Sequence, residues 1–207
     1  MKKTIIIILL TLLLLPSCSK NGQTDETTAL PLPPAETENY GTDWAYAELD
    51  RQIPSDDPDF AVTGAGFEYR DGWLGADENG YFDVAVNYEP GPDESFTFEF
   101  DFYAKDNGAL WLGFWLYGKD SLYGDGMGGE WIKISDGKIT NGGKEYKTAS
   151  GKAAKIKLAA RGDGFILYAD GAEIINSNSG AQNGGGAVKL RSDKSPVYIK
   201  NLAFKIG

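Results

Sequence analysis

Two carboxylates, Glu99 and Asp101, stand two residues apart within a segment of alternating phenylalanines. Side chains of a β-strand point to opposite faces in turn, so both carboxylates project from one face, about 7 Å apart. Enzymes that cleave glycosidic bonds use such a pair, one carboxylate as the acid and the other as nucleophile or base. The same pair can instead bind hydroxyl groups of a ligand, or form the solvated face of a strand.

Large aromatic residues are the second feature with binding chemistry. Between residues 109 and 117, one alternating set is apolar and predicts a core face, namely Leu110, Leu112, Phe114 and Leu116. The opposite set therefore points away from this core, and it contains Trp111, Trp115 and Tyr117. Trp131 and Tyr103 fall on the corresponding phase of neighbouring segments. Large aromatic rings on a solvent-facing surface indicate a binding surface, because soluble proteins seldom expose a contiguous apolar patch without a function.

Three interpretations of these rings stay open. Sugar rings have flat C–H faces that stack on exposed indoles, while the polar groups of Glu99, Asp101 and Tyr103 would bind hydroxyls. Alternatively, residues 118–129 or residues 44–50 cover the rings and create a second core. Contact with a protein partner is the third interpretation.

Composition excludes several other chemistries. The chain of 207 residues contains no histidine, which removes Ser-His-Asp catalysis, Cys-His catalysis and His-ligated zinc. Cys18 is the single cysteine, so the chain cannot form an internal disulfide. The formal net charge of −10 repels nucleic-acid phosphates, so DNA and RNA are not expected partners.

Two further motifs give no cofactor or metal prediction. Residues 124–129 match G-x-G-x-x-G, but the next segment reads as a strand, where a dinucleotide site needs a helix. Residues 55–59 are rich in carboxylates but lack the spacing of a calcium-binding loop. We therefore predict no catalytic residue, no metal ligand and no cofactor.

The N-terminal residues predict export and lipid anchoring. Lys2 and Lys3 precede an apolar run of about eleven residues, too short to cross a bilayer core of about 30 Å but suited to a secretory signal. The run ends in Leu15-Pro16-Ser17-Cys18, which resembles the lipobox of bacterial lipoproteins. The resemblance implies cleavage before Cys18, acylation of that cysteine, and a location in the bacterial cell envelope, at the outer membrane or cell surface.

Composition divides the rest of the chain into a tether and one domain. Residues 1–17 form the predicted signal peptide. Residues 18–41 are rich in Thr, Pro, Glu and Asn and cannot bury enough apolar surface to order themselves, so they are predicted to be a disordered tether. Residues 42–207 form the predicted domain.

Alternation of apolar and polar residues dominates this domain. It is clearest in residues 82–88, 96–103, 110–117, 132–134, 156–160, 165–169, 188–190 and 197–199. Hairpin-turn signals are present at residues 106–108, 135–137, 162–164 and 170–171. Short strands that each have one apolar face predict an all-β, two-sheet antiparallel sandwich.

The order of these segments resembles the concanavalin A-like lectin/glucanase jelly roll, including laminin-G-like and 3-keto-disaccharide hydrolase domains. The resemblance runs from about Phe67 to the C-terminus. It rests on the stretches at residues 96–102, 109–114, 155–158, 165–171 and 196–202. Family-16 glucanases of this fold use E-x-D-x-x-E or E-x-D-x-E, and here Tyr103 and Ala104 stand where the closing glutamate belongs.

These features together predict a surface-anchored module that binds an oligo- or polysaccharide on a concave sheet face. Trp111, Trp115, Tyr117 and Trp131 would supply rings, and Glu99, Asp101 and Tyr103 would bind hydroxyls. The alternatives are a glycoside hydrolase of the same fold, and a structural lipoprotein that docks an envelope protein.

Overall fold

The computed structural model describes residues 44–47, 49, 52–118, 127–180, 185–192 and 194–207. The predicted signal peptide, the tether and Cys18 lie outside the described residues. Thirteen strands are present, and the described residues include no helix. In chain order they are β1 (Ala45–Ala47), β2 (Phe60–Arg70), β3 (Trp73–Val86), β4 (Phe96–Ala104), β5 (Ala109–Gly118), β6 (Met127–Ser135), β7 (Lys138–Asn141), β8 (Lys144–Lys147), β9 (Ala154–Arg161), β10 (Gly164–Ala169), β11 (Ala172–Ser177), β12 (Ala187–Ser192) and β13 (Val197–Ile206).

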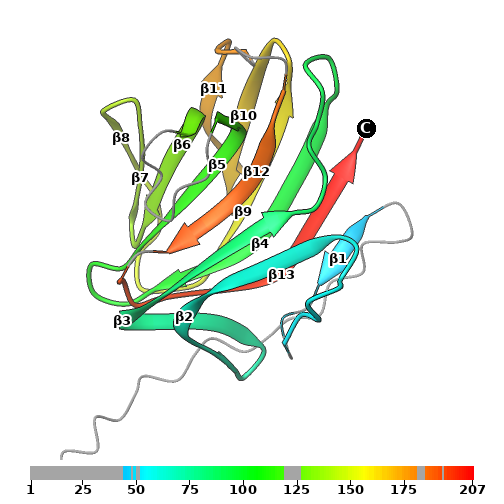
Figure 1. Cartoon of the computed structure of the whole chain (residues 1–207). Helices are drawn as coiled ribbons and strands as arrows, with labels where there is room; N and C mark the ends of the chain where they lie inside the picture. The colour runs from blue at the N-terminus through cyan, green and yellow to red at the C-terminus, as the bar shows by residue number, and fades with distance from the viewer. Residues whose placement is uncertain (1–43, 48, 50–51, 119–126, 181–184, 193) are drawn as a thin grey trace, which may run out of the picture. The chain divides into compact units, whose positions relative to one another are not determined.

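All thirteen strands join in one hydrogen-bonded antiparallel sheet, which folds over the core as two packed layers (Figure 1). The first layer has the order β11-β10-β9-β4-β13, and β1 also pairs with β13. The second layer has the order β3-β12-β5-β6-β7-β8, with β2 on the free side of β3. The predicted all-β sandwich is confirmed.

The long strand β3 belongs to both layers. Its first residues, Leu74–Ala76, pair with β13 of the first layer. Its later residues, Asp83–Ala85, pair with β12 of the second layer. Strand β2 follows β3 along this course as a hairpin partner. The hairpin turn at Asp71 and Gly72 has positive φ at both residues, as the right-handed twist of paired strands favours.

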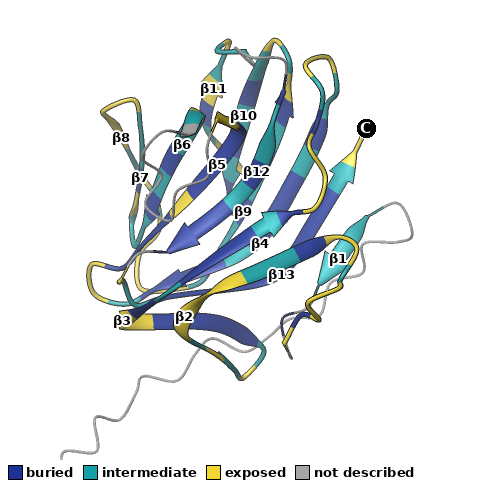
Figure 2. Cartoon of the chain, viewed as in Figure 1, coloured by how far each residue is buried: buried dark blue, intermediate teal, exposed yellow. Residues whose placement is uncertain are grey.

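A single large core fills the space between the layers, and alternation builds it from both sides (Figure 2). One phase of β4 contributes Phe96, Phe98, Phe100 and Phe102. From the second layer, apolar residues of β3, β5, β6 and β12 pack against them, for example Phe82, Leu112, Ile132 and Leu190. The other phase of each strand therefore faces away from the core, and the two layers present two outer surfaces.

Three of the four predicted hairpin turns are confirmed. Strands β6 and β7, β9 and β10, and β10 and β11 pair directly across them. The turn at residues 106–108 is different, because the strands it joins, β4 and β5, lie in different layers. The chain passes from one layer to the other there. The predicted site residues of β4 and those of β5 therefore lie in different layers.

Within the described residues, no helix has the length and apolar character needed to cross a membrane.

Candidate binding site

One outer surface of the sandwich gathers aromatic and cationic side chains. It is made by residues of β3, β12, β5 and β6 that point away from the core, and we call it the aromatic face. Its members are Asp83, Lys189, Arg191, Trp111, Gly113, Trp131 and Lys133. Strand register places Asp83, Arg191, Trp111 and Lys133 in one row, and Lys189, Gly113 and Trp131 in the next.

The indole of Trp131 lies across β5. Gly113 is its direct partner there, and a Cβ atom at this glycine would fall 2.7 Å from Cζ3 and 2.8 Å from Cη2 of the indole. Beyond β5, the guanidinium carbon of Arg191 is 5.9 Å from the Trp131 ring centroid. Because Gly113 has no side chain, the ring can extend from β6 toward β12 and meet a cation there.

Trp111 is the more exposed ring of the aromatic face, with 37% of its surface accessible. In the register it lies between Arg191 and Lys133. The Lys133 ammonium is 5.6 Å from the Trp111 ring centroid, which is within the range of a cation–π contact. Trp111 and Trp131 are diagonal neighbours on β5 and β6, a separation that aromatic side chains can span.

Two members of the aromatic face, Asp83 and Arg191, form a buried ion pair. The Arg191 guanidinium donates through Nε to Oδ1 of Asp83 at 2.8 Å, and through a terminal nitrogen to Oδ2 at 2.9 Å. Both residues are less than 10% exposed. This bidentate geometry fixes the orientation of the planar guanidinium. It therefore also fixes the position of the cation that contacts the Trp131 ring.

The predicted outward position of Trp115 is wrong, because its side chain is 2% exposed and belongs to the main core. Strand β5 contains a bulge between Phe114 and Tyr117, where the register with β6 shifts. Trp115 takes φ of +53° within that bulge. The extra residue breaks the alternation, so Phe114 and Trp115 both turn inward.

Tyr117 lies beyond the bulge and does not continue the row of Trp111. It is 40% exposed and pairs with Gly128, and its ring covers that glycine. Gly128 has the phase of Glu130 and Ile132, opposite to that of Trp131. Of the three rings predicted to share a surface on β5, only Trp111 remains on the aromatic face.

Glu99, Asp101 and Tyr103 lie on the other outer surface of the sandwich. The prediction that they adjoin Trp111 is wrong, because β4 pairs with β9 and β13 in the first layer. Oxygens of Glu99 lie 3.5 Å from Nζ of Lys155 and 3.3 Å from Nζ of Lys157. The carboxylate is thus matched by cations of its own layer, which accounts for its burial without a ligand.

Asp101 is also engaged within the first layer. It accepts a hydrogen bond of 2.7 Å from the Asn201 side-chain amide, and Nζ of Lys200 is 3.8 Å away. Asn201 itself sits at a bulge of β13 with φ of +52°, a conformation that asparagine tolerates better than most residues.

Tyr103 is 8% exposed and packs with Trp73 and Tyr198 in a small second cluster on this surface. Its ring centroid is 6.5 Å from that of Trp73 and 6.1 Å from that of Tyr198. Burial raises the pKa of the Tyr198 phenol above its ordinary value, partly offset by the nearby Arg70 cation. Tyr103 is thus buried by Trp73 and Tyr198, which belong to neither segment considered as a cover, whereas Trp111 is exposed.

Of the first segment considered as a cover for the rings, residues 44–47 and 49 are described. Their strand β1 pairs with β13 in the first layer. Residues 119–126 lie outside the described residues.

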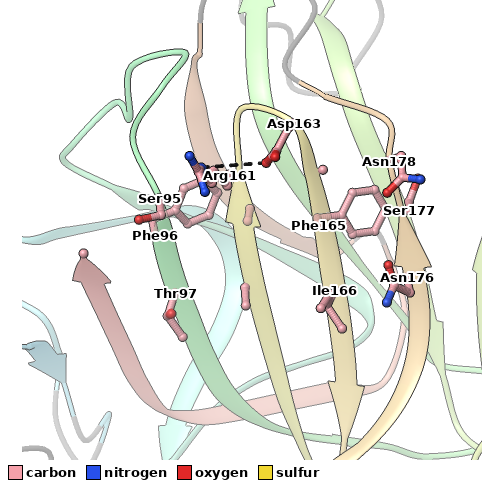
Figure 3. Close-up of a pocket in the computed structure, with 14 residues that line it drawn as sticks. Ser95, Phe96, Thr97, Arg161, Asp163, Phe165, Ile166, Asn176, Ser177 and Asn178 are labelled. Carbon is pink, nitrogen blue, oxygen red and sulfur yellow. Dashed lines mark ion pairs between the residues drawn. The ribbon is translucent and has the colours of Figure 1, made fainter.

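Two depressions lie on the first layer. One, of about 550 Å³, runs over β4, β9 and β10 and is lined by Glu99, Lys155, Lys157 and Tyr168 among others. The other, of about 360 Å³, lies near the β9–β10 turn and is lined by polar residues that include Arg161, Asp163 and Asn176 (Figure 3). The rings that line the second pocket, Phe96 and Phe165, are both 2% exposed core residues.

The polar part of the aromatic face was missed from sequence. None of Asp83, Lys189 and Arg191 was predicted to belong to a site, although the first two lie within the alternating segments 82–88 and 188–190. The sequence offered only a weak signal, because Lys189 and Arg191 alternate with buried Val188 and Leu190 as the outward residues of any half-buried strand do.

Metal-binding geometry is absent from the described part of the chain, since no three Asp, Glu, Cys or His residues there are close enough to hold an ion.

The all-β sandwich fold of this domain is similar to that of solved lectin-type domains. The carbohydrate recognition domain of Emp46p in its metal-free form aligns with a TM-score of 0.56 and 13% identity, over 77% of this chain and 93% of that one. The corresponding domain of Emp47p aligns at 0.55 and 12%, over 77% and 93%. The exoplasmic/lumenal domain of VIP36 in a Ca²⁺/Man₂-bound form aligns at 0.55 and 8%, over 79% and 87%.

No protein-family model matches the sequence, and no curated protein matches it.

Proposed function

We propose that this protein is a surface-anchored module that binds glycan through the aromatic face. The observation that carries the proposal is the exposed indole of Trp111 beside Trp131, in a row with the buried Asp83–Arg191 pair. A flat ring next to fixed polar groups suits a sugar, which offers C–H faces for stacking and hydroxyl groups for hydrogen bonds.

The solved structures that share this fold include sugar-binding domains. Emp46p and Emp47p domains are carbohydrate recognition domains, and the VIP36 domain is described with bound Man₂. Their identities of 8–13% support the fold alone, so the proposed site rests on the residues of this chain.

Replacement of Trp111 by alanine should weaken glycan binding more than tenfold. A sugar that covers roughly 60–90 Å² of the ring gains about 2 kcal/mol at about 25 cal/mol per Å². Because the ring is already partly exposed, the free energy of unfolding should change by less than about 1 kcal/mol. Titration of the full-length protein in detergent with polysaccharides, followed by Trp fluorescence, measures the binding.

Tyr88→Ala is the matched control for this variant. Tyr88 is 43% exposed, but it follows β3 and its ring adjoins Phe204 of the first layer. Its removal should leave binding unchanged. Equal loss of affinity in both variants, or no loss in Trp111→Ala, would place the glycan elsewhere.

Anchoring is the second part of the proposal. The n-region, the short apolar run and Cys18 support export, cleavage before the cysteine, and attachment to the bacterial cell envelope at the outer membrane or cell surface. Several acyl chains on one residue hold firmly, because each buried CH₂ adds about 0.8 kcal/mol.

Cys18→Ala should release the protein from the membrane fraction or leave an unprocessed precursor. Cell fractionation and the mass of the N-terminal peptide measure these outcomes. The anchoring proposal is wrong when the variant is processed and fractionates like the parent protein.

A further inference from the structure

We infer that the glycan bound by the aromatic face is acidic, with a carboxylate or sulfate group placed near Lys133. This inference rests on the proposed function and names the class of its ligand.

The charge balance of the aromatic face is opposite to that of the chain. The whole chain has a formal net charge of −10. The aromatic face contains three cations, Lys133, Lys189 and Arg191, and one anion, Asp83. Because both oxygens of the Asp83 carboxylate accept hydrogen bonds from the Arg191 guanidinium, Asp83 does not offset the charge of Lys133.

Lys133 is the cation best placed to meet a ligand. It lies directly opposite Trp111 in the register, and its ammonium is 5.6 Å from the ring centroid. No described carboxylate forms an ion pair with it. A sugar stacked on Trp111 would therefore bring its substituents within reach of this ammonium.

On the other outer surface, by contrast, two lysines form ion pairs with a carboxylate on a neighbouring strand. Lys155 and Lys157 each lie within 3.5 Å of an oxygen of Glu99, on the strand beside them. On the aromatic face, the position opposite Lys133 on β5 is occupied by an indole in place of a carboxylate. The arrangement leaves the counter-charge to be supplied by the ligand, and it fits an anionic sugar better than a neutral one.

Four probes test the inference on the full-length protein in detergent: polygalacturonate, a sulfated galactan, neutral galactan, and vesicles of anionic phospholipid. At about 0.01 M salt, where the Debye length is about 30 Å, an acidic polymer should bind at least about fivefold more tightly than neutral galactan. At about 1 M salt, where the Debye length is about 3 Å, the preference should disappear. The carboxylated and sulfated polymers distinguish the two sources of charge.

Lys133→Ala should lower the affinity for the acidic polymer much more than the affinity for neutral galactan and so remove most of the preference, while Lys133→Arg should retain it. Lys157→Ala, on the opposite surface, is the control for the general charge of the protein and should not alter the preference.

The outcomes separate this inference from the proposed function. Equal binding of acidic and neutral polymers, or equal effects of Lys133→Ala and Lys157→Ala, overturns the acidic class and leaves glycan binding intact. Absence of binding to every polysaccharide overturns both. Binding to the anionic vesicles alone also overturns both, and would identify the aromatic face as a membrane contact.

Discussion

Replacement of Trp115 by alanine should lower the free energy of unfolding by about 3–5 kcal/mol, the range for removing a buried Trp side chain. The Trp115 ring centroid lies 5.0 Å from that of Phe114 on the same strand and 6.2 Å from that of Phe165 on β10. Because β5 and β10 belong to different layers, these rings hold the two layers together at one end of the core. Denaturant-induced unfolding of the full-length protein measures the loss.

Trp111→Ala is the comparison that makes this result specific. Trp111 and Trp115 lie on one strand and were predicted to share a surface, yet the first is 37% exposed and the second 2%. Equal stability losses in the two variants would contradict the inward turn of Trp115. The opposite pattern is expected in binding, where only Trp111→Ala should weaken the proposed binding of glycan.

Trp115→Phe isolates the indole N–H. Nε1 of Trp115 is buried, and no described residue accepts a hydrogen bond from it. An unpaired buried donor costs about 1–3 kcal/mol, so a phenylalanine that removes the N–H and keeps most of the ring should be far less harmful than alanine. A loss as large as that of Trp115→Ala would show that the N–H is satisfied in solution.

Alternation predicted the fold class and most of the strands, because it is a local consequence of one buried and one outward face. The phenylalanines of β4 and the leucines of β5 show it without interruption over the central residues. Strand β2 was missed, since its sequence Thr63-Gly64-Ala65-Gly66 has no apolar phase and its residues there are exposed. The four-residue strands β7 and β8 are too short for a period-two pattern to stand out.

The candidate site was harder to predict, because alternation shows whether a side chain points away from the core but not which layer it belongs to. Glu99 and Trp111 are both outward, yet the crossing at residues 106–108 puts them on opposite surfaces. Layer membership depends on long-range pairing, such as β4 with β9 and β5 with β12. The inward turn of Trp115 depends on a bulge that no turn residue marks on β5, although Gly129 with φ of +119° lies beside it on β6.

The Asp83–Arg191 pair is the other feature on which stability should depend strongly. Its side chains are 12% and 7% exposed, although they lie on an outer surface, because the Trp131 ring and the neighbouring strands shield them. An ion pair at this depth has lost most of its hydration, so each charge depends on the other for compensation. The pair also links β3 to β12, next to the point where β3 passes from one layer to the other.

Arg191→Met should therefore lower the free energy of unfolding by about 3–5 kcal/mol, because it leaves the Asp83 carboxylate buried without its cation. The double variant Asp83→Leu/Arg191→Met removes both charges and should recover most of that loss, since apolar residues of similar volume often replace a buried ion pair at little cost.

Lys138→Met is the matched control, because the Lys138–Glu145 pair has a similar distance of 2.9 Å but its side chains are 46% and 62% exposed. That variant should cost less than about 1 kcal/mol. Denaturant unfolding of the parent, Asp83→Leu, Arg191→Met and the double variant gives the coupling energy of the pair. A loss in Arg191→Met no larger than in Lys138→Met would show that the Asp83 carboxylate is hydrated in solution.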